Sequence, residues 1–260
     1  SKVMLHKWEE PVLAGSGGSG AVFFGGCTLG CKYCQNMAIS GAPTGTAATP
    51  AELRRLFEEL IAQGAENIDL VTPTHYLPTI LPALEPKLSV PVVYNCGGYE
   101  SVNSLNLLEN KVQIYLPDLK YSDDELAIKY SDAPDYFEIA TNAIKEMYRQ
   151  VGNCEFDEDG IMTKGVIIRH LILPNNLENT KRVIDWVKEN FNDGEVLFSL
   201  MSQFTPNKTC KIPELSRRLT QEEYDKILKT HYGSYMELPP VEKRGQYHEI
   251  LFYPDKPYTE

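Results

Sequence analysis

This sequence of 260 residues lacks long apolar runs, a signal-peptide pattern and an excess of basic residues. There is no run of about 18 apolar residues, so we expect no membrane-spanning segment, and there is no signal-peptide pattern. Basic residues are outnumbered, with 25 Lys and Arg against 36 Asp and Glu and a net charge of −11. This acidic balance argues against a nucleic acid or an anionic membrane as partner. The sequence therefore predicts a cytoplasmic globular protein.

The chain has only six cysteines, and three of them are scattered along the sequence. Cys96, Cys154 and Cys210 lie far apart and lack partners at the spacing of metal ligands. Together with the absence of an export signal, this argues against a disulfide framework. No second cysteine array follows the first, so we expect no auxiliary metal cluster. Cys154 and Cys210 are predicted to be structural or to lie on the surface. Cys96 could carry thiol chemistry, but a lone cysteine is more often a small hydrophobic residue.

The other three cysteines, Cys27, Cys31 and Cys34, form a C-x3-C-x2-C motif. Thiolates this close in sequence can converge on one metal centre, and Gly26 and Gly30 let the backbone wrap closely around it. Three thiolates without a fourth Cys or His beside them leave one coordination position open. On an iron–sulfur cube, that position is an iron free to bind a substrate or a cofactor.

A structural zinc site is the alternative interpretation of the same cysteines. Such a site needs four protein ligands, and Cys96 or His75 could supply the fourth. Zinc sites usually show C-x2-C pairs, however, which favours the iron–sulfur interpretation.

Apolar strands alternate with amphipathic helices along the chain, the pattern of parallel strands with crossover helices. A capping box at Thr49 and Glu52, with Pro50 at the first helical position, predicts one helix start. We expect strands at 21–24, 68–71, 90–94, 112–116, 165–173 and 195–201, and helices at 50–63, 79–84, 101–108, 122–130, 136–151, 179–191 and 221–229. Six βα units predict an α/β fold, a partial (β/α)6 TIM-like barrel.

We expect two parts in the chain. Residues 1–20 form an N-terminal extension, in which the Gly/Ser-rich run 14–20 has the composition of a flexible linker. Residues 21–260 form the barrel, which ends in a C-terminal helical extension.

Polar residues gather where the predicted strands end, and function collects at the carboxyl ends of barrel strands. Besides the cysteine motif, these residues are Thr72, Thr74, His75, Asn95, Cys96, Asp118, Lys120, Arg169, Ser202 and Gln203. Arg169 and Leu171 share one face of their strand, while His170 points the other way. We therefore expect Arg169, rather than His170, to face the barrel interior.

The cysteine motif, on a loop after a short apolar strand, resembles that of the radical S-adenosylmethionine (SAM) superfamily. The segment 34–36, Cys-Gln-Asn, is similar to the Cys-aromatic-Asn of pyruvate formate-lyase-activating enzymes, and 118–120 resembles their Asp-Leu-Lys. The segments 6–11, 71–76 and 169–174 resemble an uncharacterised activase-like branch. The resemblance covers most of the chain and implies the same (β/α)6 barrel.

The resemblance also implies cofactors and residue roles. A [4Fe–4S] cluster would be held by the three motif cysteines, and SAM would chelate its open iron. Lys120 and Arg169 look placed for the SAM carboxylate, Asn36 for a cofactor contact, and Leu171 and Gln203 for the adenine and ribose. Asp118 would bind a monovalent cation or merely cap the next helix. Thr72 and Thr74 occupy the place of a Gly-Gly-Glu segment that holds the SAM amine in related activases, and they bring no carboxylate.

By resemblance, the protein would cleave SAM reductively to a 5′-deoxyadenosyl radical that abstracts hydrogen. It would accept electrons from a flavodoxin- or ferredoxin-like donor and activate a glycyl radical enzyme. Radical modification of a small molecule or a peptide is one alternative. A non-catalytic metal-binding or electron-transfer module is another, although it gives no purpose to Lys120, Arg169 and Gln203.

Overall fold

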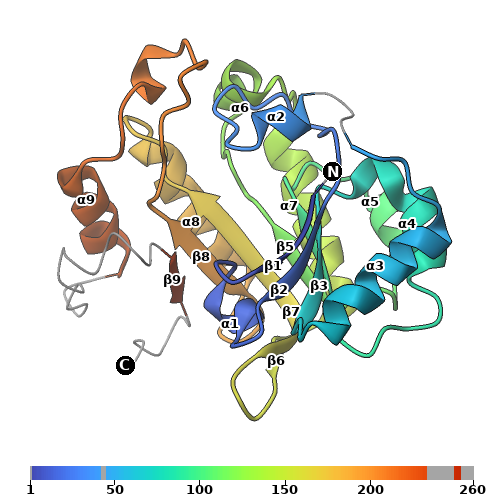
Figure 1. Ribbon diagram of the computed structural model, residues 1–260. Coiled ribbons are helices and arrows are strands. Elements are labelled where there is room, and N and C mark those ends of the chain that lie inside the picture. The colour runs from blue at the N-terminus through green and yellow to red at the C-terminus, as the bar shows by residue number, and fades with distance from the viewer. Residues whose placement is uncertain (1, 42–44, 233–248, 253–260) are drawn as a thin grey trace.

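The computed structural model describes residues 2–41, 45–232 and 249–252, and its centre is one curved, mostly parallel sheet (Figure 1). In the described residues the strand order is β1-β2-β3-β4-β5-β7-β8-β9, with β6 paired to β7 as a hairpin. The strands are β1 (Lys2–His6), β2 (Ser19–Phe23), β3 (Asn67–Val71), β4 (Val92–Cys96), β5 (Ile114–Pro117), β6 (Glu155–Phe156), β7 (Met162–Leu171), β8 (Leu197–Met201) and β9 (Glu249–Phe252).

Six of these strands run parallel, namely β2, β3, β4, β5, β7 and β8. They correspond to the six predicted strands, so the partial (β/α)6 barrel is confirmed. The strand boundaries shift by up to two residues at most ends. The largest shift is at β7, which begins three residues early because Met162 already pairs with β6.

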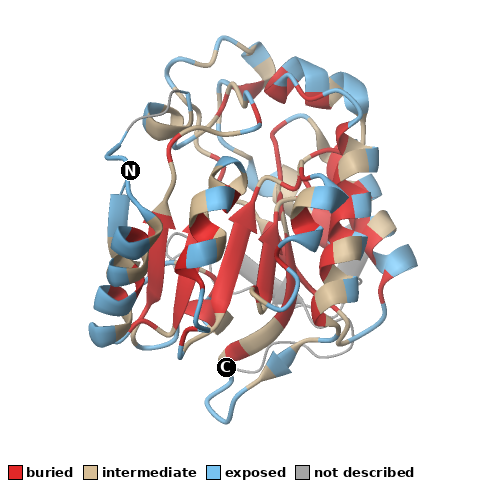
Figure 2. Cartoon of the chain, turned by 90° about the vertical axis from the view of Figure 1, so that its right-hand side faces the viewer, coloured by how far each residue is buried: buried red, intermediate tan, exposed pale blue. Residues whose placement is uncertain are grey.

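The helices lie along the outer face of the sheet and leave its strands buried between them and the interior (Figure 2). They are α1 (Pro11–Ala14), α2 (Met37–Ser40), α3 (Pro50–Ala62), α4 (Leu77–Ala83), α5 (Val102–Asn106), α6 (Asp124–Ser131), α7 (Tyr136–Val151), α8 (Leu177–Asn190) and α9 (Gln221–Tyr232). The predicted capping box of α3 is present, with Thr49 and Glu52 bonding each other's backbone N–H groups. Such a cap contributes about 1 kcal/mol to helix stability.

The two edge strands were not predicted. β1 pairs antiparallel with β2, and β9 pairs antiparallel with β8. The linker interpretation of 14–20 was wrong, because Ser19 and Gly20 are buried in β2 and the Gly17 N–H donates to the Glu66 carboxylate. A Cβ on Gly20 would lie 3.0 Å from the Asn67 carbonyl oxygen, so close strand contact accounts for this glycine. Of the predicted C-terminal helical extension, α9 and β9 are described, and 233–248 and 253–260 lie outside the described residues.

The barrel interior has an apolar floor below its polar upper part. The floor is a cluster of buried side chains from four strands and one helix: Leu13, Val93, Ile114, Leu116, Met162, Ile167 and Leu197. Leu13 belongs to α1, which thus plugs the lower end of the barrel.

Candidate functional site

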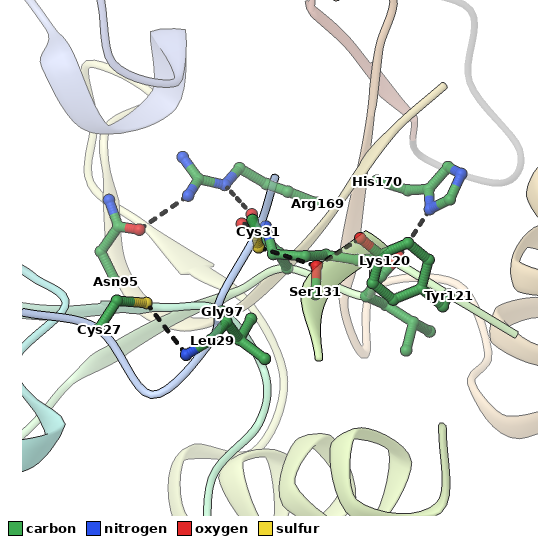
Figure 3. A network of polar contacts seen from close by, with 12 residues as sticks. Cys27, Leu29, Cys31, Asn95, Gly97, Lys120, Tyr121, Ser131, Arg169 and His170 are labelled. Carbon is green, nitrogen blue, oxygen red and sulfur yellow. Dashed lines mark hydrogen bonds and ion pairs between the residues drawn. The ribbon is translucent and has the colours of Figure 1, made fainter. Parts of the chain in front are cut away.

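The cysteine loop crosses the carboxyl ends of the strands and is fixed from both sides. Backbone N–H groups of Gly30 and Lys32 donate to the carbonyl groups of Ser131 and Tyr130 at the end of α6, at 2.9 and 2.8 Å. Leu29 packs against Gly97 at the end of β4, where a Cβ would lie 2.6 Å from the leucine Cδ1 (Figure 3). The loop therefore holds its cysteines in a set place.

Each motif sulfur accepts a hydrogen bond. The Leu29 N–H donates to Cys27 Sγ at 3.4 Å, the Ser40 hydroxyl to Cys34 Sγ at 3.3 Å, and the Ser131 hydroxyl to Cys31 Sγ at 3.0 Å. Hydrogen bonds to ligand sulfurs are one of the means by which proteins adjust iron–sulfur clusters. All six cysteines of the chain are free thiols.

Behind Cys31 lies a buried chain of hydroxyl groups. Ser131 gives its proton to the sulfur, so it accepts from the Tyr121 hydroxyl at 2.6 Å, and Tyr121 in turn accepts from Tyr33 at 2.8 Å. Tyr121 and Ser131 have no exposed surface, and Tyr33 is 6% exposed. The direction of proton donation along the chain thus runs toward the sulfur and favours negative charge on it.

We predict that Ser131→Ala lowers the midpoint potential of the reconstituted cluster. Loss of the hydroxyl donor destabilises the reduced, more negative state, because hydrogen bonds to the sulfurs help to set the potential. A redox titration followed by electron paramagnetic resonance (EPR) measures the shift. Tyr33→Phe is the matched control, since it removes the far hydroxyl and leaves the sulfur bonded. An unchanged potential in Ser131→Ala would contradict the role of this bond.

Burial raises the pKa of the Cys27 and Cys31 thiols, while nearby Lys120 opposes the rise. Burial alone would lower the pKa of Lys120, but Asp118 and then Cys31 raise it well above its usual range. The cysteines thus stay protonated until a metal centre takes up their thiolates, and loading releases protons.

A charge network lies beside the cysteine loop, at the ends of β4, β5 and β7. The Lys120 ammonium contacts Asp118 Oδ2 at 2.5 Å, and Arg169 Nε donates to Asp118 Oδ1 at 3.0 Å. The same guanidinium donates to Asn95 Oδ1 at 2.7 Å and to Glu9 Oε1 at 3.1 Å. Burial would raise the pKa of Asp118, but Lys120 and Arg169 hold it below its usual value. Asp118 therefore fixes the position of two cations.

This charge network concerns two predictions, the interior position of Arg169 and a monovalent cation at Asp118. Arg169 faces the interior, as the alternation predicts, yet three partners already engage its guanidinium, and we therefore assign it a positioning role. Both oxygens of Asp118 face cations, so nothing in the described part of the structure supports a monovalent metal ion there.

Glu9 brings a second carboxyl group into the interior next to Asp69 of β3. Asp69 is fully buried, and its Oδ2 accepts from the Asn95 amide at 3.3 Å. Burial and then the negative charge of Glu9 raise the pKa of Asp69 well above its usual range. The N-terminal segment thus contributes directly to the interior polar layer.

The loop after β3 contains a strained residue and a carboxylate that the sequence did not reveal. Thr72 has a φ of 58°, in the left-handed region that β-branched residues avoid, and its N–H donates to the Asn95 carbonyl at 2.8 Å. The Thr74 hydroxyl donates to Glu100 Oε1 at 2.8 Å, and the Tyr94 hydroxyl donates to Glu100 Oε2 at 3.1 Å. Glu100 comes from the loop after β4, and these bonds bring its carboxyl group next to the loop after β3.

Glu100 is 2% exposed, and burial raises its pKa to about 7, although the Thr74 and Tyr94 hydroxyls oppose the rise. Its negative charge also raises the pKa of Cys27, as expected for a group close to the cysteine loop. The sequence does contain a segment that resembles Gly-Gly-Glu, namely Gly-Gly-Tyr-Glu at 97–100. This segment follows a different strand from the one in related activases.

The remaining predicted residues lie around the same end of the barrel. Asn36 precedes α2 and is exposed, Leu171 is half-buried at the end of β7, and Gln203 is exposed after β8. His170 points outward, where its ring nitrogens contact the Leu119 carbonyl at 2.6 Å and the Thr180 hydroxyl at 2.9 Å. Burial lowers the pKa of His170 to about 4, so it is neutral and structural.

The donor set fits an iron–sulfur cluster better than a single metal ion. Among the described residues, no three His, Cys, Asp or Glu side chains converge closely enough to hold one ion, which argues against zinc. The thiolates of a cube bind different irons and therefore stand farther apart than the ligands of one ion. Cys96 is 3% exposed and, by strand alternation, lies on the opposite face of β4 from Asn95. Three half-buried thiols can hold a cube with one open iron, and the donor to each sulfur would help to set its potential.

Comparisons with known proteins agree with this interpretation. Residues 13–73, which include the three motif cysteines, match the family described as a 4Fe-4S single cluster domain. An uncharacterized protein from Methanocaldococcus jannaschii is 32% identical over 240 residues, which span 88% of this chain. The match covers 65% of that protein, so the chain spans just under two thirds of the length of its curated relative.

Solved structures show the same fold at low sequence identity. SuiB from Streptococcus suis, bound to S-adenosylmethionine, has a TM-score of 0.56 and 15% identity over 88% of this chain and 55% of its own. The FeFe-hydrogenase maturase HydG from Carboxydothermus hydrogenoformans has a TM-score of 0.56 and 16% identity, over 87% of this chain and 55% of its own. The solved structures thus show the fold, and the family match describes residues 13–73 as a 4Fe-4S single cluster domain.

No helix in the described part of the chain has both the length and the hydrophobicity needed to cross a bilayer.

Proposed function

We propose that the protein is a radical SAM enzyme that cleaves SAM reductively and uses the resulting 5′-deoxyadenosyl radical to abstract hydrogen. The observation that carries this proposal is the loop of three free thiols, each with a hydrogen-bond donor, fixed above the polar end of a partial barrel. When bound, the cluster supplies the electron and the open iron that this chemistry needs.

The chain's own residues provide complementary charges for SAM. Lys120, held by Asp118, is the cation for the SAM carboxylate. Glu100, held by Thr74 and Tyr94, is the acceptor for the SAM ammonium group, in the role that the Gly-Gly-Glu acid has in related activases. Opposite charges at two fixed points orient a zwitterion better than either charge alone.

The other predicted contacts complete the SAM site. Leu171 and Gln203 are proposed for the adenine and ribose, and Asn36 for a contact next to the cluster. The floor around Leu13 closes the interior from below, which limits the access of water to a radical.

The experiment is anaerobic reconstitution with iron and sulfide, followed by reduction with dithionite and chromatography for 5′-deoxyadenosine. We expect a product that depends on SAM, reductant and cluster. A well-loaded, reducible cluster that yields no 5′-deoxyadenosine would overturn the proposal and favour the non-catalytic electron-transfer module.

For the substrate, we propose a glycine of a glycyl radical enzyme. The similarity of segments 34–36 and 118–120 to those of pyruvate formate-lyase-activating enzymes supports this. An EPR doublet on a candidate glycyl radical enzyme, dependent on SAM and reductant, is the expected result. If every candidate stays silent while small molecules or peptides stimulate SAM cleavage, the substrate assignment fails and the SAM chemistry stands.

A small polar substrate is the second candidate. The interior layer of Glu9, Asp69, Asn95 and Arg169 favours it, since this layer offers charges and amides at short range and lies over a closed floor.

A further inference from the structure

The charge of the surface beside the cysteine loop is opposite to that of the whole chain. The chain carries a net charge of −11, yet the segments 27–41 and 205–218 together contain five basic residues and one acidic residue. The basic residues are Lys32, Lys208, Lys211, Arg217 and Arg218. Such local concentration in an acidic protein creates a positive field that acts on charged partners.

The second segment is in direct contact with the cysteine loop. The Asn207 amide donates to the Cys34 carbonyl at 3.0 Å, and the Gln35 amide donates to the Thr205 carbonyl at 2.6 Å. The Thr209 hydroxyl also lies 3.4 Å from the sulfur of Met37 in α2. Lys208 and Lys211 therefore flank residues that touch the cluster-binding loop itself.

These two lysines are available to a partner. Both are exposed, and within the described residues neither forms an ion pair, whereas Lys32 is paired with Asp132 and Arg217 with Glu223. Arg218, at the end of the same segment, is likewise exposed and has no acidic partner in the described part of the chain. Unpaired surface cations next to a redox centre have no stabilising role within the fold.

We propose that the surface around Lys208 and Lys211 is the docking site of an acidic one-electron carrier protein that reduces the cluster. This inference rests on the proposed function, because it assumes a cluster on the three motif cysteines. The carrier loses one electron and the cluster gains it, and no proton or group is transferred. Electron transfer weakens steeply with distance, so a carrier must dock next to the cysteine loop, where the positive surface lies.

The geometry also fits the kind of contact such carriers make. Electron-transfer complexes are small and short-lived, and charge complementarity sets their association rate more than their lifetime. Rim charges act on that rate and on its salt dependence. Two unpaired lysines on one loop are sufficient for this steering and insufficient for a permanent interface.

The test measures cluster reduction directly, without SAM or substrate. The double variant K208E/K211E is compared with the unmodified protein and with K7E/K87E, which makes the same change of net charge with exposed lysines at the amino ends of the strands. Each protein is reconstituted and mixed in a stopped-flow instrument with a prereduced acidic flavodoxin. We expect the second-order rate constant of K208E/K211E to fall about tenfold at low ionic strength, and the difference to shrink as salt is added.

Two further reductants separate docking from other causes. Reduced methyl viologen, a small cation, should reduce K208E/K211E at least as fast as the unmodified protein, and dithionite should bring every variant to the same final extent of reduction. An unchanged flavodoxin rate, or an equal fall in K7E/K87E, would overturn the docking site. A flavodoxin rate that is unchanged while an acidic protein substrate is modified more slowly would assign the surface to that substrate instead. Failure of dithionite to support SAM cleavage in all proteins would instead count against the proposed function.

Discussion

Replacing Cys27, Cys31 or Cys34 by Ala is expected to remove most of the iron and to abolish the formation of 5′-deoxyadenosine. Each thiolate binds a different iron of a cube, and a cube with two protein ligands is not retained in a loop that half exposes its cysteines. Iron analysis, visible absorption and product chromatography on the reconstituted variants measure the loss.

The remaining cysteines serve as controls for this prediction. Cys96→Ala, Cys154→Ala and Cys210→Ala should keep both iron and activity, because none of the three belongs to the motif, Cys96 is buried in the core and Cys154 contacts the Val166 carbonyl. Loss of metal in Cys96→Ala would make a site with four thiolates the better description.

Replacing Glu100 by Gln should weaken SAM binding about tenfold to a hundredfold at pH 8. A hydrogen bond to a charged group is worth roughly 1.5–3 kcal/mol, and about 1.4 kcal/mol corresponds to a tenfold change in affinity. Isothermal titration of cluster-loaded protein with SAM gives the dissociation constant. An unchanged constant would remove Glu100 from the SAM site.

The pH dependence provides an independent check of the same residue. Burial raises the pKa of Glu100 to about 7 in the free protein, and a bound ammonium group would lower it by favouring the carboxylate. SAM affinity should therefore fall as the pH drops below about 7, approaching a tenfold loss per pH unit. In Glu100→Gln this dependence should vanish.

Stability serves as the folding control for Glu100→Gln. Because the folded-state pKa lies above the unfolded value, the protonated form is favoured in the fold, and this contribution to stability is lost as the pH rises through about 7. Above about pH 7, the loss of the negative charge in Glu100→Gln should therefore not lower the melting temperature.

Periodicity and capping were enough to predict the barrel. The 3.6-residue pattern of α7 gave its bounds, Tyr136–Val151, and six buried strands gave the sheet. The edge strand β1 was missed because none of its residues is fully buried. The start of β2 was missed because a glycine-rich composition looks the same in a linker and in a closely packed strand. Local sequence patterns thus predict local secondary structure, but they do not predict contacts between distant segments.

The same distinction applies to the candidate site. The cysteine motif is contiguous, and it was therefore visible in the sequence. Glu100, Ser131 and Glu9 reach the site from three loops or helix ends separated by many residues, and only the fold brings them together. The placement of Arg169 could be predicted from strand alternation, but its three partners could not.

Arg169 links the ion pairs of Glu9 and of Lys120, so ligand binding at one of these residues affects binding at the other. Its guanidinium bonds Glu9 on one side and Asp118 on the other, and Asp118 in turn holds Lys120. A molecule that draws Glu9 away from Arg169 leaves Asp118 as the main counter-charge of the guanidinium, and Lys120 is then freer to pair with a carboxylate. By linkage, a carboxylate that engages Lys120 must change the affinity for that molecule by the same factor. This one side chain therefore couples two ligands of the barrel, and binding measurements made with one ligand alone do not report that coupling.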